Sequence, residues 1–518
     1  MDPQQYFAQL NQDYLAVAEP KEDLFWTTFM GVRDDTGELP AAEKAYQQFV
    51  SDPARPAALR AQIEAAEQSG ADPQLLHGLK GWLQFFEVNA IESEAARDME
   101  AGIIQDDADL FERRKQLSLQ YTKADGDTVE ASTLVLSTNL TSEDDEAVRK
   151  SSHEALLRLE EWVVNNGFIE MMKRRNAFAR AQGYRNFFDY KVNKEERMTP
   201  EQLFDILDEF ERLTRDAQQR GWDMLRKKHG DKALEGHNLK YFARGSSAQK
   251  LDAYLPFSES LKRWVESFGR MGVDFRGATL TLDLLDRKGK YENGFMHAPR
   301  VAWNTPEGWS PAVINFTSNA TPDQVGSGDD GLNTLFHEGG HAAHFANVNQ
   351  NAPCFSQEFP PTAMSYAETQ SMFFDSLLRD ADWLTQYAKN TAGESVPAEL
   401  MQELIAAEQP LAAYYERGIL VVPKFEWAIY SLPEDELTPE RLLREARYWE
   451  KTILGLECAP RPLLAIPHLL DKGSACSYQG YLLANMAVYQ TRAWFLREYG
   501  HITDNPAVGP LLAQHYWA

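Results

Sequence analysis

The sequence predicts a mainly α-helical protein with one small β-sheet. Two helix-start signals support the helical assignment. Thr199-Pro200-Glu201-Gln202 combines a threonine cap, a proline at the first helical position and a glutamine at the third. Thr438-Pro439-Glu440 repeats the cap and the proline near the other end of the chain. The alternation typical of β-strands is confined to residues 278–316. We therefore expect a sheet in the middle of an otherwise helical chain.

Helices are expected along the whole of residues 1–195. Thr141-Ser142-Glu143-Asp144 is expected to start a helical pattern that runs to about Ala181. The helix that begins after Thr199 has apolar residues at helical spacing and is expected to end at Gly230. No stretch of the sequence reads as a linker rich in proline and serine, so no sharp domain boundary is predicted.

Two short strands are expected in the middle of the chain. Residues 278–284 alternate between apolar and polar side chains, and residues 286–290 then turn the chain. A second strand is expected at residues 311–316. The stretch 317–330 is rich in Ser, Gly, Asn and Asp and predicts a loop. Asp330 is then expected to cap the next helix.

Composition excludes several classes of partner. The 518 residues carry a formal net charge of −26, which argues against nucleic acid and against anionic membranes. No apolar run is long enough to span a bilayer, and the first residues lack the features of a signal peptide. Cys354, Cys458 and Cys476 are too few and too scattered for a disulfide framework or a thiolate metal site. We expect a cytoplasmic protein with reduced thiols.

A His-Glu-x-x-His motif lies in the helix expected after the loop. His337 and His341 are just over one helical turn apart, so both imidazoles can bind one metal ion from the same face. Glu338 lies roughly 100° around the helix, where a general base for a metal-bound water belongs. The adjacent Gly339 and Gly340 cost a helix roughly 2 kcal/mol relative to alanine, which indicates close approach of another backbone or of substrate. The alternative is a helix with ordinary polar or core histidines.

A catalytic zinc needs a third protein ligand and one open position. The third histidine of the longer form of this motif is absent, because Asn347 stands in its place. Glu358 lies in a loop limited by prolines and is expected to be exposed. Glu368 lies in an apolar helix, where an unpaired carboxylate would be costly. We predict that Glu368 is the third ligand, with a buried salt bridge as its alternative role.

Polar residues near these ligands are candidates for orienting them. Ser371 and Asp375 continue a polar stripe from Glu368 along the same helix, and Asp375 is a candidate acceptor for a ligand imidazole N–H. His344 lies on nearly the same face as His337, but as a fourth ligand it would close the open position. We expect it to orient a ligand or the substrate instead. Two histidines and a carboxylate suit one Zn²⁺ per chain best, with Mn²⁺ or Co²⁺ as substitutes.

The expected chemistry is hydrolysis at a carbonyl group. Zinc would lower the pKa of its water to about 7, Glu338 would take the proton, and the hydroxide would attack a polarised carbonyl. The resulting oxyanion needs hydrogen-bond donors, and His468, Tyr478 and Tyr481 are candidates near the end of the chain. Taken alone, this cluster also fits ordinary core packing.

Five separate segments resemble the zinc metallopeptidases of the thimet oligopeptidase and oligoendopeptidase F family. In chain order they are residues 283–290, 311–316, 335–344, 368–375 and 468–481. The first two resemble the family's strand and turn signatures, the next two its zinc-ligand helices, and the last its substrate-binding segment. The chain departs from the pattern at Gly339, where the family usually has an aromatic residue. A family tyrosine falls at Ser474, and the interval from His468 to Tyr478 is one residue longer.

The resemblance implies a two-lobed helical molecule with a deep central channel and the small sheet next to the zinc helix. Residues 1–195 would form part of the channel wall and residues 196–518 the catalytic region, with an approximate boundary and lobes that are not contiguous in sequence. It further implies cleavage of internal bonds of short, unstructured peptides. We expect a monomer or small homo-oligomer. The alternatives are a metallocarboxypeptidase of similar architecture and a non-catalytic peptide-binding protein. The complete set of motif residues argues against the latter.

Overall fold

The computed structural model describes residues 2–33, 37–287, 289–291 and 293–517. Lys288, within the turn expected at residues 286–290, lies outside this range. Helices account for 68% of the residues and strands for 7%, which confirms the predicted mainly helical fold.

The chain divides into two compact units that interleave along the sequence. The first unit comprises Met1–Glu92, Leu255–Ala388 and Leu483–Ala518, and the second comprises Ser93–Tyr254 and Lys389–Leu482. Each unit is therefore discontinuous in sequence. The boundary expected near residue 195 falls inside the second unit.

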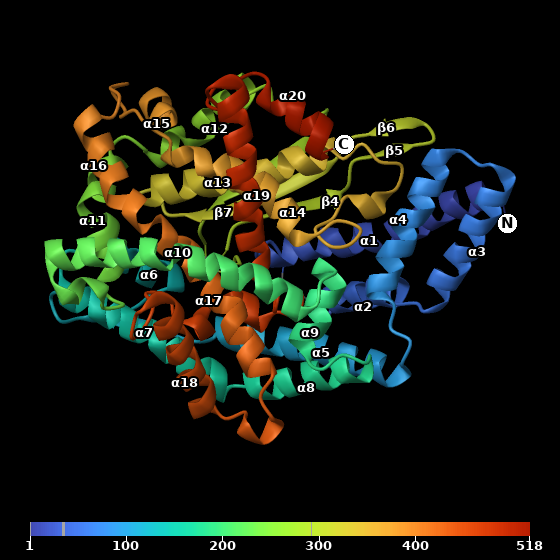
Figure 1. The fold of residues 1–518 in the computed structure, drawn as a ribbon, viewed down its shortest axis with the longest axis horizontal. Helices are drawn as coiled ribbons and strands as arrows, with labels where there is room; N and C mark the ends of the chain where they lie inside the picture. Colours follow the sequence, from blue (N-terminus) through green and yellow to red (C-terminus); the bar gives the residue numbers. More distant parts are fainter. Residues whose placement is uncertain (1, 34–36, 288, 292, 518) are drawn as a thin grey trace. The chain divides into compact units, whose positions relative to one another are not determined.

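The first unit begins with four helices that share an aromatic core. They are α1 (Pro3–Phe29), α2 (Glu38–Val50), α3 (Ala54–Ser69) and α4 (Pro73–Asn89) (Figure 1). The ring of Trp82 is fully buried in this core and packs against Tyr14, Phe85 and Phe86. Its Nε1 donates a 2.7 Å hydrogen bond to Asn11 Oδ1, so the one polar atom of this large side chain is satisfied.

A three-stranded sheet follows, in the spatial order β3-β7-β4. Its strands are β3 (Thr279–Leu285), β4 (Phe295–Arg300) and β7 (Val313–Ala320). β3 and β7 are parallel, with Leu282 opposite Phe316, whereas β4 and β7 are antiparallel, with Phe295 opposite Thr317. Both predicted strands are present, although β7 runs further than expected. β4 was not predicted; its Pro299 is tolerated because β4 is an edge strand of this sheet.

Two further pairs of short strands lie outside this sheet. They are β1 (Gln120–Thr122) with β2 (Thr128–Glu130), and β5 (Trp303–Thr305) with β6 (Gly308–Ser310). The expectation that residues 1–195 are helical throughout is therefore wrong at β1 and β2. Each strand is only three residues long, too short for a visible alternation.

The helix that carries the histidine motif is α13 (Ser327–Asn347), which packs against β7, α12 (Ser260–Arg270) and α14 (Met364–Asp375). The prediction that Asp330 caps α13 is wrong. Gly326, with a φ of 89°, precedes the helix, and Asp330 lies in its first turn, where a carboxylate still complements the helix dipole.

Aromatic rings join these elements into one core. The ring of Phe268 on α12 lies 5.4 Å from that of Phe336 on α13 and 4.5 Å from that of Phe374 on α14, measured between centroids. Trp264 packs edge-on against Phe316 of β7. The first unit is completed by α15 (Ala381–Tyr387), most of α19 (Gln479–Tyr499) and α20 (Val508–Leu512).

The second unit is built mainly of helices. Besides three described next, they are α5 (Glu94–Lys115), α9 (Phe187–Lys191), α10 (Pro200–His229), α11 (Leu239–Asp252), α16 (Ala398–Glu408), α17 (Ala412–Tyr430) and α18 (Pro439–Trp449). The capping box predicted at Thr199 is present: Thr199 Oγ1 accepts from the Gln202 amide, and Gln202 Oε1 accepts from the Thr199 amide. Gly230 ends α10, as predicted.

The helical pattern expected to start at Thr141 and to run to about Ala181 is not one uninterrupted helix. The structure has α6 (Thr133–Ser142), α7 (Glu146–Asn165) and α8 (Phe168–Ala181) instead. Asp145 caps α7, and Gly167, with a φ of 108°, separates α7 from α8. A left-handed glycine inside a continuous amphipathic pattern redirects the chain without changing the periodicity.

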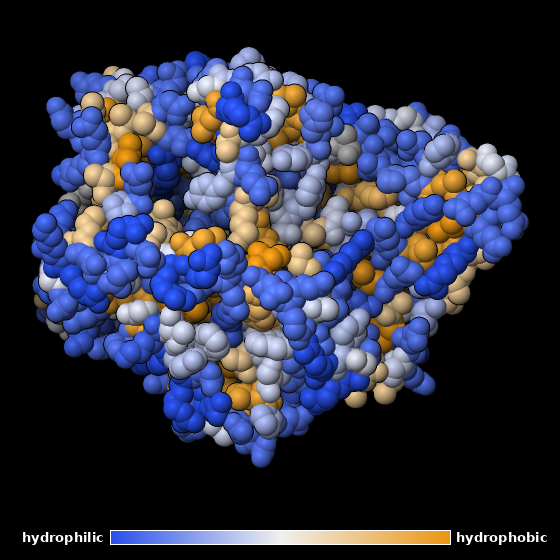
Figure 2. Space-filling model, in the orientation of Figure 1, coloured by the Kyte–Doolittle hydropathy of each residue, from blue (hydrophilic) through white to orange (hydrophobic). Residues whose placement is uncertain are grey.

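The face drawn in Figure 2 is mostly hydrophilic, with hydrophobic side chains in separate patches. This agrees with the formal net charge of −26. Within the described ranges, no helix has both the length and the apolar character needed to cross a membrane. All three cysteines are free thiols.

Candidate metal centre

Helix α13 presents His337 and His341 on one side, one turn apart. Their rings meet edge to face with centroids 5.1 Å apart. His341 is almost fully buried, whereas the side chain of His337 keeps 21% of its exposure. Because residues four positions apart lie on the same face of a helix, both imidazoles point to the same side of α13.

The two glycines of the motif allow α12 and α14 to lie very close to α13. A Cβ at Gly340 would lie 2.7 Å from Ser371 Cα and 2.8 Å from Gln370 O, both backbone atoms of α14. A Cβ at Gly339 would lie 2.2 Å from Nε1 of Trp264 on α12. Close approach of another backbone, one of the two reasons expected for these glycines, is therefore present at Gly340.

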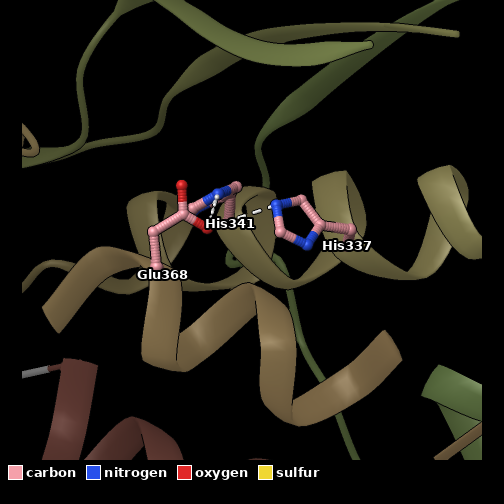
Figure 3. A group of neighbouring side chains, drawn as sticks. All are labelled: His337, His341 and Glu368. Atoms are coloured by element: carbon pink, nitrogen blue, oxygen red, sulfur yellow. Dashed lines mark ion pairs between the residues drawn. The ribbon is translucent and has the colours of Figure 1, made fainter. Parts of the chain in front are cut away.

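This close packing brings Glu368, on α14, to the two imidazoles. Glu368 Oε2 lies 3.3 Å from His337 Nε2 and 3.5 Å from His341 Nε2 (Figure 3). Burial favours the neutral acid, but the two imidazoles outweigh it and hold the pKa of Glu368 well below its usual range. The carboxylate is therefore anionic and directed at both rings.

The three side chains fit a tetrahedral zinc ion. Donor atoms about 2.0–2.1 Å from such an ion lie about 3.3–3.4 Å from one another, close to the separations of 3.3 and 3.5 Å between Glu368 Oε2 and the two Nε2 atoms. Two neutral imidazoles and one carboxylate are also the donor types of catalytic zinc sites, in which the fourth position stays open. Among the described residues, His337, His341 and Glu368 form a donor group in which His341 and Glu368 are buried and His337 is half-buried; His344 does not belong to it.

Hydrogen bonds hold the donors in place. His337 Nδ1 lies 2.8 Å from Asp375 Oδ2, so the ring can donate from Nδ1 and keep Nε2 for a metal. Ser371 Oγ lies 3.0 Å from Glu368 Oε2 and is fully buried. Both contacts place the predicted orienting residues beside the predicted ligands.

Glu338 lies on the neighbouring face of α13 and is buried, with only 6% of its surface exposed. Burial raises the pKa of Glu338 to about 6, although His337 and His341 oppose the rise. An acid with a pKa near neutrality can accept and return a proton at physiological pH. Its Oε1 lies next to Gly294, immediately before β4, since a Cβ at that glycine would be 3.8 Å away.

His344 lies one turn beyond His341 and is buried. Its ring packs against Phe345 and edge-on against Tyr366. Burial lowers the pKa of His344 to about 3, so the ring is neutral. His341 lies near enough to lower the pKa of His344 further, and the aromatic contacts of the ring are with Phe345 and Tyr366.

His468, Tyr478 and Tyr481 form a cluster in the second unit. Their ring centroids lie 5.1–5.9 Å apart, and His468 Nε2 is 3.2 Å from the Tyr481 hydroxyl. All three side chains are half-buried, so each keeps access to solvent. Ser474, at the position of a family tyrosine, instead donates to Asp471 through its amide and its hydroxyl.

Two neighbours of the centre were not predicted as such. Glu358 is half-buried, not exposed, and lies near enough to Glu368 for the two carboxylates to repel. The start of β4 lies beside Glu338. The position of Glu358 between the two ligand-bearing helices could have indicated that it lies near the metal centre. The strand β4 could not be recognised, because it contains Pro299 and lacks the alternation of apolar and polar residues.

A His-Glu-x-x-His helix beside a helix with a third carboxylate donor defines a metallopeptidase centre. The model of peptidase family M3 matches residues 139–500, so the chain belongs to this family and is a metallopeptidase. This finding confirms the resemblance seen in the sequence.

Solved structures share the fold at low sequence identity. Metallocarboxypeptidase 1 from Trypanosoma cruzi is 16% identical, with a TM-score of 0.58 over 99% of this chain and 90% of its own. A protein assigned as an oligoendopeptidase F is 14% identical, with a TM-score of 0.59 over 95% of this chain and 88% of its own. At these identities the likeness establishes the fold. No curated protein sequence gives a significant match.

Proposed function

We propose that this metallopeptidase uses zinc to hydrolyse internal bonds of short, unstructured peptides. The observation that carries the proposal is the position of Glu368 Oε2, within 3.5 Å of the Nε2 atoms of both His337 and His341. When bound there, zinc supplies Lewis-acid activation of a water molecule and polarisation of the scissile carbonyl.

The chain's own residues supply the proton transfers. Glu338 accepts a proton from the attacking water and passes it to the nitrogen of the leaving amine. Its burial supports this role, because a pKa raised to about 6 makes the carboxylate a stronger base than an exposed glutamate, and the acid that forms can still release its proton near neutral pH. Asp375 and Ser371 fix the orientation of His337 and Glu368 during the reaction.

We also propose that His468, Tyr478 and Tyr481 donate hydrogen bonds to the carbonyl oxygen as it gains negative charge. The support is chemical: the three rings contact one another, each carries a polar N–H or O–H group, and each side chain is only half-buried. Residues that serve core packing alone would be enclosed.

Short peptides are the proposed substrates because an oligoendopeptidase F shares the fold. The likeness to a metallocarboxypeptidase supports a second candidate, removal of C-terminal residues. A quenched fluorogenic peptide with an amidated C-terminus separates the two activities. Cleavage inside this peptide excludes an obligate carboxypeptidase, whereas cleavage only after the amide is replaced by a free carboxylate excludes internal cleavage. The free cysteines fit a reducing compartment, and a cytoplasmic location is part of this proposal.

The decisive variant is Glu338→Gln. It should keep stoichiometric zinc but lower the turnover of the fluorogenic peptide by about 10²- to 10⁴-fold. Glu307→Gln, an exposed carboxylate in the same unit, is the matched control and should leave turnover unchanged. Near-normal turnover of Glu338→Gln would refute the mechanism. Tight peptide binding without turnover by the wild-type protein would favour a non-catalytic binding protein.

A further inference from the structure

The segment that joins His468 to Tyr478 is held by side chains from distant parts of the second unit. Arg175, on α8, is fully buried and donates to the backbone carbonyls of Leu469 at 3.0 Å and Leu470 at 3.1 Å. The same guanidinium donates to the hydroxyl of Tyr430, on α17. One side chain thus fixes the two residues that follow His468.

Lys191, at the end of α9, holds the middle of the segment. Its Nζ lies 2.8 Å from the carbonyl of Gly473 and 3.4 Å from that of Lys472, and only 4% of the residue is exposed. Lys191 also forms an ion pair with Glu195, which accepts a 2.6 Å hydrogen bond from Ser477 Oγ. This ammonium group and its partner therefore contact both ends of residues 472–477.

The last part of the segment is held by Glu426, on α17. Its Oε1 accepts a 2.8 Å hydrogen bond from the amide of Cys476, and the residue is 1% exposed. Cys476 has a φ of 61°, a conformation that a non-glycine residue seldom adopts without support. The bond from Glu426 holds this residue in its left-handed conformation, two positions before Tyr478.

Burial of these ionisable groups is costly for the fold. Taking a guanidinium, an ammonium and a carboxyl group out of water is unfavourable before their hydrogen bonds form, and apolar side chains of similar volume often serve stability as well or better. What the three have in common is that each binds the backbone of residues 469–476. His468, Tyr478 and Tyr481 flank that backbone on both sides.

We infer that Arg175, Lys191 and Glu426 are positioning residues, which fix the backbone of residues 469–476 and thereby the placement of His468, Tyr478 and Tyr481 during catalysis. The inference rests on the proposed function, in which these three rings bind the developing oxyanion. Removal of a buried hydrogen-bond donor such as Lys191 should therefore lower the catalytic rate, although the donor does not touch the substrate. The reason is that a small displacement of catalytic side chains lowers the rate strongly.

The test variant is Lys191→Met, which keeps the aliphatic stem and removes the donor. Its control is Lys232→Met, an exposed lysine of the same unit that pairs with Glu146. We expect Lys191→Met to lower kcat at least about tenfold, with KM changed less than about twofold and zinc content unchanged. Lys232→Met should leave all three quantities as in the wild-type protein. A purely structural role would lower the active fraction and the zinc content together.

A double-mutant cycle shows whether Lys191 acts through Tyr481. In the Tyr481→Phe background, Lys191→Met should cost much less than in the wild-type background, because the group that it positions is already gone. If Lys191→Met does not fold, Ser477→Ala removes the adjacent bond to Glu195 with minimal change of volume and is used in the same cycle. The same reduced cost in the Tyr481→Phe background is then expected.

The outcomes separate this inference from the proposed function. If Tyr481→Phe lowers kcat but the variants of Lys191 or Ser477 do not, or if the two effects simply add, the positioning role is wrong and the proposed function stands. If Tyr481→Phe has full activity, the oxyanion role of the cluster fails, and the inference fails with it. A less than additive loss in kcat supports both.

Discussion

Asp375 Oδ2 lies 2.8 Å from Nδ1 of His337, and this contact leaves Nε2 of the same ring directed at Glu368. Replacement of Asp375 by alanine frees the imidazole to rotate and to change tautomer. We expect the affinity for zinc to fall about 10- to 100-fold, as is usual when the carboxylate partner of a ligand histidine is removed. Zinc retention across a series of chelator concentrations measures the loss. Asp323→Ala, at an exposed position of the same unit, should retain zinc like the wild-type protein, and an unaltered affinity in Asp375→Ala would show that the contact does not support the metal.

Removal of Glu368 should abolish stable zinc binding, because only two imidazoles remain to hold the ion. The purified Glu368→Ala variant is expected to contain far less than one zinc per chain by elemental analysis. Glu358→Ala is the matched control: it removes another carboxylate between α13 and α14, one outside the donor group, and should keep its zinc. Full occupancy in Glu368→Ala would move the third ligand to Glu358 or Asp375.

The features that sequence could predict are local ones. Histidines four residues apart on a helix must share a face, and a capping box or a strand alternation is contained within a few residues; the elements at Thr199 and around residue 280 followed from such signals. Glu368 followed from burial, because a carboxylate in an apolar helix needs a partner. The helical pattern expected from Thr141 is interrupted twice, because Asp145 caps a new helix and the left-handed Gly167 ends the pattern of that helix before the next one begins.

The features that sequence could not predict depend on residues far apart in the chain. The contact of Lys191 with the Gly473 carbonyl joins positions 282 residues apart, and nothing near either residue signals it. The glycine pair indicated that something approaches α13, but only the structure identifies α14 and Trp264 as the neighbours. Such contacts are determined by the packing of elements that are far apart in the chain, and the periodic pattern of a single sequence does not identify them.

Gly340→Ala should force α13 and α14 apart. The added methyl group would meet backbone atoms of Ser371 and Gln370 at 2.7 and 2.8 Å, and backbone cannot move aside as a flexible side chain can. Overpacking of this kind costs about 1–3 kcal/mol, so the free energy of unfolding should fall by that amount in denaturant titrations. Zinc affinity should fall as well, because Glu368 moves with α14.

The control for that substitution is Gly418→Ala on α17. Among the described residues, no atom outside its own stretch of helix lies within 4 Å of its Cβ position, so alanine should be neutral or stabilise by up to about 1 kcal/mol. If Gly340→Ala were as stable as Gly418→Ala, the close approach of the two helices would not depend on glycine.

Tyr481→Phe removes the hydroxyl that lies 3.2 Å from His468 Nε2. Loss of one oxyanion donor typically costs about 10²- to 10³-fold in kcat, and zinc content should remain unchanged. Steady-state kinetics and elemental analysis of the same preparation test both statements. Tyr499→Phe, on the same helix, is the control and should keep its activity; a loss of zinc in Tyr481→Phe would mean that the residue has been given the wrong role.

Glu426 should make stability depend on pH. Burial raises the pKa of Glu426 to about 7, compared with about 4.3 for a glutamate in an unfolded chain. Below pH 4 both states are protonated, and the residue contributes no pH dependence. Between these two pKa values the unfolded chain ionises while the folded protein stays neutral, so each pH unit lowers the free energy of unfolding by about 1.4 kcal/mol. Above pH 7 both states are ionised, and the loss is complete.

Glu426→Gln should remove this dependence, because the amide stays neutral at every pH and its oxygen can still accept from the Cys476 amide. The variant should therefore melt at a higher temperature than the wild-type protein at pH 8, and the difference should shrink markedly at pH 5. Glu307→Gln provides the reference, since an exposed carboxylate should give the same small difference at both pH values. If the difference in melting temperature between Glu426→Gln and the wild-type protein is the same at pH 5 and at pH 8, Arg175 and Lys191 keep the buried carboxylate ionised at both pH values. The stability of residues 469–476 would then depend on a buried charge pair and not on a neutral acid.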